Sequence, residues 1–407
     1  MRSGLALLAM LVVACLTIQA APAQALEISD DLTITGYADL RGVAPTDQAS
    51  YLQGGLGKFR YGGKQYGGAE GVVQADLKLG DLFQAMTVLR AEPQTPGVVD
   101  ALETYLRYDD AGANNLSWSV KAGAFFPTIS LENDDIGWAS PYTLTPSAIN
   151  SWIGDELRTI GSEGTLRWKS DLGTVSLIGA VLCCNDENGT MMASHGWTMD
   201  DRPTGLFERV RLSIQSQKLF FAAPYARTGE FDEIDGHVGY YAGASLAIPD
   251  IGKISVIRYD NEGNPAAKTL RDTAWDTRFW SVGARTNLRP VILIAQAMRG
   301  STIVVGPGFV SNTKFQSAFG LASYDLGDFR FSLREDLFAN RRAGAVNNIW
   351  SEDGDATTGA ISWTGRESYR ITAELIRMNS RRGEYVPAGL GRQRTDRQFQ
   401  LDARYFF

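Results

Sequence analysis

Basic residues recur at alternate positions in many short segments of this chain, on the polar face of the segment. Rings of such side chains around a narrow aqueous passage would favour anions, because a low-dielectric wall focuses their field on the passing ion. The alternative is that they are solvated residues paired with acids on neighbouring segments, without selectivity. The predicted set is Arg41, Arg107, Lys121, Arg167, Lys169, Arg209, Arg211, Arg285, Arg330, Arg334, Arg370 and Arg404.

A group of acidic residues lies in one long connecting segment, 127–161. Its members are Glu132, Asp134, Asp135, Asp155 and Glu156. If these carboxylates faced the basic residues across a passage, the opposition would set up a transverse field at a constriction. The sequence also predicts a short helix in this segment that starts near Ser147. The alternative is an ordered segment that packs on the rim and leaves the passage open.

The elements that must position these charges are β-strands. In the segment 32–41, apolar or small residues at even positions alternate with mostly polar residues at odd positions. This period of two is typical of a strand with one apolar and one polar face. The pattern recurs in 69–79, 83–91 and 116–126, and it continues to the end of the chain.

The connections between these segments alternate between short and long. Eight short turns are expected at 80–81, 109–115, 170–173, 214–216, 249–252, 288–289, 325–328 and 365–366. Nine long segments lie between them, at 42–68, 92–98, 127–161, 185–204, 227–235, 261–274, 300–311, 339–354 and 379–394. This asymmetry predicts an all-β, closed antiparallel transmembrane β-barrel of 18 strands, with 16 as the alternative count. A sheet in lipid must close because an open edge would leave backbone groups unpaired.

The two ends of the barrel region carry further signals. Residues 1–25 have a positive start, an apolar run and the small-x-small sequence Ala23-Gln24-Ala25, which predict a cleaved signal peptide and export. Residues 26–407 are then one barrel domain. The last strand alternates apolar residues with polar ones and ends on an aromatic residue. Its apolar face holds Phe399, Leu401, Tyr405 and Phe407.

This last strand resembles that of Gram-negative outer-membrane porins, which ends in phenylalanine and is read by the barrel-assembly machinery. The resemblance implies an outer-membrane location, contact with outer-membrane lipid, a homotrimer, and passive diffusion of small hydrophilic solutes or ions. Both the general and the phosphate-selective types are open. In these porins the third long loop folds into the barrel, and 127–161 is the third long loop here.

Other function classes find little support. The net charge of −7 argues against nucleic-acid binding, and two histidines leave little material for His-based catalysis or metal sites. We therefore expect no enzyme activity, no cofactor and no metal site. The alternative is an outer-membrane enzyme or adhesin on the same scaffold. The glycine-rich segment 54–68, with Lys58, Arg60 and Lys64, lacks a complete phosphate-loop pattern and is predicted to be a mobile external loop.

Overall fold

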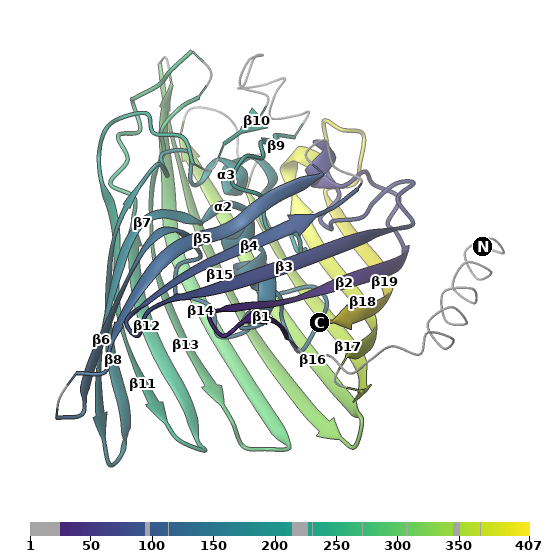
Figure 1. The fold of residues 1–407 in the computed structure, drawn as a ribbon. Helices are drawn as coiled ribbons and strands as arrows, with labels where there is room; N and C mark the ends of the chain where they lie inside the picture. The colour runs from purple at the N-terminus through teal and green to yellow at the C-terminus, as the bar shows by residue number, and fades with distance from the viewer. Residues whose placement is uncertain are drawn as a thin grey trace.

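The computed structural model describes residues 25–93, 98–112, 114–213, 227–229, 231–270, 272–306, 308–344, 351–366 and 368–407. Within them, a sheet of 17 strands closes into a barrel (Figure 1). One strand, β1 (Leu26–Ser29), only extends the sheet beside the start of β2, so 16 strands form the wall. The proposed signal peptide lies outside the described residues, except Ala25.

Every neighbouring pair in the wall is antiparallel, and the pairing of the last strand with the first barrel strand closes the barrel. The last strand pairs with the first barrel strand from Phe399↔Ala44 to Phe406↔Tyr37. The wall strands are β2 (Leu32–Ala44), β3 (Gly67–Leu79), β4 (Phe83–Ala91), β5 (Val99–Asp110), β6 (Leu116–Phe125), β7 (Thr159–Ser170), β8 (Gly173–Cys183), β11 (Gly239–Ile248), β12 (Gly252–Asp260), β13 (Asp276–Thr286), β14 (Val291–Gly306), β15 (Phe309–Leu326), β16 (Phe329–Gly344), β17 (Glu352–Arg366), β18 (Tyr369–Arg382) and β19 (Gln393–Phe406).

The predicted count of 18 strands is wrong, and the alternative of 16 is correct. The prediction placed two wall strands on either side of a turn at 214–216, which lies outside the described residues. In the structure β8 pairs directly with β11 over nine residue pairs. The described residues between them form only β9 (Val210–Arg211) and β10 (Arg227–Thr228), which pair with each other. Because the backbone groups of β8 and β11 already pair, no further strand can enter the wall there.

The predicted asymmetry of the connections is present. One rim carries short turns, and the other carries the long loops (Figure 1). We call these L1 (45–66), L2 (92–98), L3 (126–158), L4 (184–238), L5 (261–275), L6 (307–308), L7 (345–351) and L8 (383–392). The connection that forms L6 was predicted to be long, at 300–311. It is short because β14 and β15 continue as a hairpin to Gly306 and Phe309.

Helices occur only in loops among the described residues. They are η1 (Tyr51–Gln53) in L1, η2 (Ile136–Trp138) and α2 (Ala148–Glu156) in L3, α3 (Thr190–His195) in L4, and η4 (Gly383–Tyr385) in L8. The predicted start of α2 is confirmed, because Ser147 is its N-cap and the Ser147 hydroxyl accepts from the Asn150 amide at 3.3 Å. No described helix has the length and apolar character to cross a membrane.

The two faces of β19 follow the predicted alternation. On β19, Gln398, Gln400 and Asp402 are buried inside, whereas Phe399 is exposed outside. On β5, a β-bulge opposite Val88 turns the side chain of Leu102 into the barrel. Tyr259 on β12 is fully buried and accepts hydrogen bonds from Asn185 and Asn188.

Candidate functional site

The lumen on the long-loop side is filled by loops folded inward. All nine residues of α2 are buried, and so are all six of α3. Both helices lie within the outline of the wall (Figure 1). Nearer the short-turn rim, the inward-facing residues of β3, β6, β12 and β13 are half-buried, as at Asp76, Lys121, Lys253 and Arg285. The loops therefore fill the half of the lumen on the long-loop side. The half near the short-turn rim is less filled, and we call it the vestibule.

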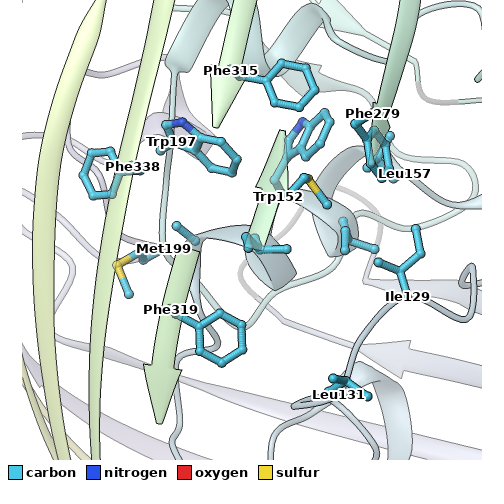
Figure 2. Packing of buried hydrophobic residues seen from close by; sticks show 14 of the residues in the cluster. Ile129, Leu131, Trp152, Leu157, Trp197, Met199, Phe279, Phe315, Phe319 and Phe338 are labelled. Carbon is cyan, nitrogen blue, oxygen red and sulfur yellow. The ribbon is translucent and has the colours of Figure 1, made fainter. Parts of the chain in front are cut away.

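An apolar cluster holds the loops against one side of the wall. Trp152 of α2 lies at its centre and packs edge-on against Phe315, Phe279 and Trp197, with ring centroids 4.9, 5.6 and 6.0 Å away (Figure 2). Phe319 and other inward-facing residues of β13 to β18 extend the cluster. Close-packed aromatic side chains leave no water-filled passage on this side of the lumen.

Arg334 on β16 anchors L3 to the wall through a fully buried guanidinium. It forms ion pairs with Asp336 at 2.7 Å and with Glu132 of L3 at 2.8 Å. It also donates to the backbone oxygens of Thr145 and Pro146, at 2.7 and 3.0 Å. One side chain thus binds the loop at several points in the fixed planar geometry that guanidinium provides.

Carboxylates on the wall hold the same stretch of L3 from the other direction. Asp336 accepts from the Ala148 amide at 3.0 Å, at the start of α2, where the helix dipole favours negative charge. Glu374 on β18 accepts from the amides of Leu144 and Thr145, at 2.7 and 3.1 Å. L3 therefore lies inside the barrel as an ordered part of its core.

L1 and L4 meet beside β17. Lys58 of L1 is 2% exposed and forms an ion pair with Glu352 of β17 at 2.6 Å. Its ammonium also donates to the backbone oxygens of His195 and Trp197 in L4, at 2.8 and 3.1 Å. The predicted mobile external loop at 54–68 is thus wrong over this stretch, because buried ion pairs fix L1 inside the lumen.

A network of buried charges joins these loops to the wall of β2, β3 and β19. Arg41 pairs with Asp39 and Asp402 on the wall and with Asp201 of L4. Arg60 of L1 pairs with the same Asp201 at 3.1 Å. Burial alone would raise the pKa of Asp201, but Arg41 and Arg60 outweigh it and hold the pKa well below its usual range. Asp201 therefore stays charged and links two loops to the wall.

Three of the five acidic residues predicted for the constriction form ion pairs with arginines of the wall. Glu132 pairs with Arg334, Asp134 with Arg285, and Asp135 with Arg370. The other two face protein groups inside the loops. Asp155 accepts from the Tyr51 hydroxyl at 2.9 Å, and Glu156 accepts from the Trp152 indole at 2.6 Å.

The basic residues predicted to line a pore divide into two groups. Arg209 and Arg211 lie in L4, and they are not wall residues because that segment does not enter the wall. The remaining ten are on wall strands and point inward by the alternation of their strands: Arg41, Arg107, Lys121, Arg167, Lys169, Arg285, Arg330, Arg334, Arg370 and Arg404. Arg41, Arg334 and Arg404 are fully buried among partners, so charge on the wall does not by itself mean contact with water.

A small polar cavity, with about 10 Å³ of water-accessible volume, remains beside L3. It lies between residues 139–144 of L3 and the wall, where Tyr37, Arg370 and Arg404 line it. Tyr142 of L3, which the sequence did not single out, lies near both Arg285 and Arg330, whose guanidinium carbons are 5.6 and 5.4 Å from its ring centre. No spacing signal marks Tyr142, because its contacts depend on how L3 folds.

Two basic side chains of the vestibule wall, Lys253 and Arg167, lack an acidic partner among the described residues. Lys253 of β12 lies directly opposite Arg285 of β13 in the register of the sheet, and both face inward. Arg167 on β7 donates to the Ser119 hydroxyl at 3.0 Å. Among the described residues Lys253 and Arg167 have no carboxylate partner within ion-pair distance. Like charges directly opposite one another create a positive potential in the space between them.

Glu156 is a buried titratable group, and it gives the protein a testable pH dependence. Burial raises its pKa to about 7, from an ordinary value of 4.5. The unfolded chain loses this proton near pH 4.5, whereas the folded protein keeps it until about pH 7. The free energy of unfolding should therefore fall between these values as the pH rises, by on the order of 3 kcal/mol.

Urea unfolding of the refolded protein at pH 5 and pH 7.5 checks this dependence. Glu156→Gln should make the difference between the two pH values smaller, because its side chain does not titrate. Part of the difference should remain, because burial also raises the pKa values of Glu187 and Asp200 in L4. Glu262→Gln, at an exposed carboxyl in L5, serves as the control and should behave as the wild type. An unchanged pH dependence in Glu156→Gln would contradict the assignment.

Neither histidine is placed as a base on the lumen wall. His195 is buried in α3 with its Nε2 2.8 Å from the Arg211 oxygen, and burial lowers its pKa to about 3. His237 lies exposed in L4, with its Nδ1 3.5 Å from a carboxylate oxygen of Asp235.

Two groups of carboxylates gather where L4 meets L5, and their oxygens are of the kind that Ca²⁺ prefers. Within each group the ligand atoms lie within 4.8 Å of one another. One group is Asp186, Glu233 and Asp235, and the other is Glu187, Asp232 and Asp272. Arg209 forms ion pairs with Asp232 and Asp272, so the second group is partly compensated. The prediction of no metal site stays a prediction.

Comparison with known proteins rests on the fold. No protein-family model matches the chain, and no curated protein matches its sequence. The structure is similar to OmpT, an outer membrane protein of Vibrio cholerae, with a TM-score of 0.52 at 10% identity over 95% of this chain and 100% of that one. It is also similar to OmpF of Salmonella typhi, solved in complex with daunomycin, with a TM-score of 0.54 at 12% identity over 92% and 97%. The chain thus has the fold of an outer-membrane β-barrel.

Proposed function

We propose that this protein is a porin-class channel of the outer membrane that passes small hydrophilic solutes or ions by passive diffusion, with a preference for anions. The observation that carries the proposal is the docking of L3 inside the wall through three acid–arginine pairs, which sets carboxylates of L3 opposite Arg285, Arg334 and Arg370 of the wall. Charged groups fixed on both sides of a narrow passage are the arrangement from which ion selectivity arises.

The preference for anions follows from the vestibule. A permeating ion would pass Arg167, Lys253 and Arg285, of which only Arg285 has a described carboxylate partner. In a space bounded by low-dielectric protein and lipid, such fixed charges raise the local concentration of anions and lower that of cations. The resemblance to phosphate-selective porins is consistent with this arrangement, and the identity of the solute remains part of the proposal.

Zero-current potentials across a planar bilayer under a salt gradient test the selectivity. We expect the wild type to show the sign of an anion-preferring channel. Arg167→Gln/Lys253→Gln should move the potential markedly toward zero, because it removes two positive charges from the path. Lys268→Gln/Arg392→Gln changes the same charge on exposed loop residues and should leave the potential nearly unchanged at physiological salt. A cation preference in the wild type would refute the basic-wall hypothesis.

The second candidate is an outer-membrane enzyme or adhesin on a barrel scaffold. The observation in its favour is the apolar cluster around Trp152, which fills one side of the lumen. We favour the channel because the cavity beside L3 and the vestibule are lined by charged and polar residues, and we propose that the protein is not an enzyme. Complete absence of stepwise conductance would favour this second candidate.

The remaining parts of the proposal concern export and assembly. We infer that residues 1–25 are removed as a signal peptide in a Gram-negative cell. We also infer that the barrel-assembly machinery reads the last strand through Phe399, Leu401, Tyr405 and Phe407, and that the protein works as a homotrimer in outer-membrane lipid. The strand has the expected form, since Phe407 closes the barrel by exchanging backbone hydrogen bonds with Gly36.

A further inference from the structure

The outer face of the barrel carries positive charge on one side only. Basic residues point outward on seven of the eight adjacent strands β12 to β19. We call them the outer basic belt: Arg258, Arg278, Arg299, Lys314, Arg341, Arg377, Arg381 and Arg397. The outward-facing positions of β2 to β8 and β11 hold no lysine or arginine among the described residues. The belt is therefore a local feature and does not ring the barrel.

The belt lies where the apolar outer surface ends on the long-loop side. On β18 the outward positions run from Tyr369 near the short-turn rim through Ile371, Ala373 and Leu375 to Arg377. On β19 they run from Tyr405 through Leu401 and Phe399 to Arg397. The apolar part of such a sequence matches the hydrocarbon layer, so the next residues reach lipid headgroups. Because long loops face outside in this architecture, these headgroups belong to the external leaflet.

Four members of the belt have no acidic partner. Arg258 pairs with Asp260, Arg278 with Asp276, and both Arg341 and Arg381 lie close to Asp353. The structure shows no ion pair or hydrogen bond from the side chains of Arg299, Lys314, Arg377 or Arg397 to any described residue. All four are exposed.

The sheet register places basic residues of the belt directly opposite one another on neighbouring strands. Arg377 on β18 is directly opposite Arg397 on β19, and Lys314 on β15 is directly opposite Arg341 on β16. Cross-strand neighbours lie about 5 Å apart at Cβ, and like charges in such pairs are destabilising. Arginine on a lipid-facing surface also costs free energy, less so toward the interface. A multiply charged anion between the strands would offset both costs.

We propose that the outer basic belt binds the phosphate groups of lipopolysaccharide in the external leaflet. The phosphates of its lipid A headgroup lie at the boundary between acyl chains and water, the level at which the belt is found. Guanidinium groups bind phosphate oxygens in a bidentate geometry, and seven of the eight belt residues are arginines. The proposal depends on the barrel fold and its orientation, and it does not depend on the proposed channel function.

Binding of lipid A of defined phosphorylation to the detergent-refolded protein tests the proposal. We expect bisphosphorylated lipid A to bind the wild type and dephosphorylated lipid A to bind much more weakly. Arg377→Gln/Arg397→Gln should weaken binding by about thirtyfold, because each basic residue near a membrane surface contributes about 1 kcal/mol, or about fivefold. Lys78→Gln/Arg289→Gln, two exposed residues at the short-turn rim, should bind as the wild type does.

Thermal unfolding gives a readout that a purely structural role would not produce. In detergent alone, Arg377→Gln/Arg397→Gln should unfold at the same temperature as the wild type or higher, because repulsion is removed. With bisphosphorylated lipid A, the wild type should gain more stability than the variant. Equal lipid A affinity in variant and wild type, or equal binding of the dephosphorylated form, would overturn the proposal. Binding of phosphatidylglycerol as tight as that of lipid A would overturn the assignment to lipopolysaccharide.

Discussion

Replacing Arg334 with alanine is expected to lower the free energy of unfolding by about 3 to 5 kcal/mol, because it leaves buried Glu132 and Asp336 without their cation. The same change removes the hydrogen bonds to the backbone of Thr145 and Pro146. L3 should then lose its largest group of contacts with β16, whereas the hydrogen bonds from Ala148 to Asp336 and from Arg330 to Pro141 remain. If L3 narrows a conducting lumen, the single-channel conductance of Arg334→Ala should exceed that of the wild type.

Urea unfolding and planar-bilayer recording of Arg334→Ala measure the two effects. The matched control is Arg107→Ala, which also removes an inward-facing arginine. Arg107 is partly exposed and pairs with Asp109 at 2.7 Å, so its loss should cost at most about 1 kcal/mol. The account of L3 as a docked loop is wrong if Arg334→Ala and Arg107→Ala have equal stability and equal conductance.

Replacing Trp152 with alanine is the second change with a large expected effect. Trp152 is 2% exposed and contacts three aromatic rings of the apolar cluster. Truncation of a buried tryptophan removes apolar contacts and leaves a cavity, which costs about 3 to 5 kcal/mol. It also removes the indole that donates to Glu156. We therefore expect L3 to become accessible to protease while the wall strands stay folded.

Limited proteolysis with mass spectrometry locates the cleavage sites in this variant. Phe207→Ala provides the control, since Phe207 is an aromatic residue of L4 that is 87% exposed. It should change neither the stability nor the cleavage pattern. Cleavage confined to L4 in Trp152→Ala, or a stability equal to that of Phe207→Ala, would show that the cluster does not hold L3.

The wall of this barrel could be predicted from the sequence because residues that face the lumen and residues that face outward alternate along each strand and differ in polarity. On β19 the polar face is buried inside and Phe399 lies outside, as the period of two indicates. The start of α2 could also be predicted, because a serine N-cap is recognised from the local sequence alone. The strand number was harder, because 205–213 alternates like a strand. Only the pairing of β8 with β11 excludes it from the wall.

The filling of the lumen could not be predicted in the same way. Lys58 and Arg60 lie in a glycine-rich, polar segment that has the composition of an external loop. Their partners Glu352 and Asp201 are far away in sequence, so nothing local reveals the buried pairs. The inward aromatic residues Phe279 and Phe315 fit an inner surface only because L3 and L4 cover them. The period of two therefore assigned ten basic residues to inward-facing positions of the wall strands, but it did not reveal which of them are buried.

Single-channel recording of the wild-type protein in a planar bilayer tests most directly the central claim that a narrow polar path remains beside the docked loops. We predict stepwise openings of uniform size, and we predict that these steps are smaller than those of Arg334→Ala, in which L3 has lost its contacts with Arg334. Membranes that contain folded wild-type protein but show no steps, or wild-type steps as large as those of the variant, would contradict the claim.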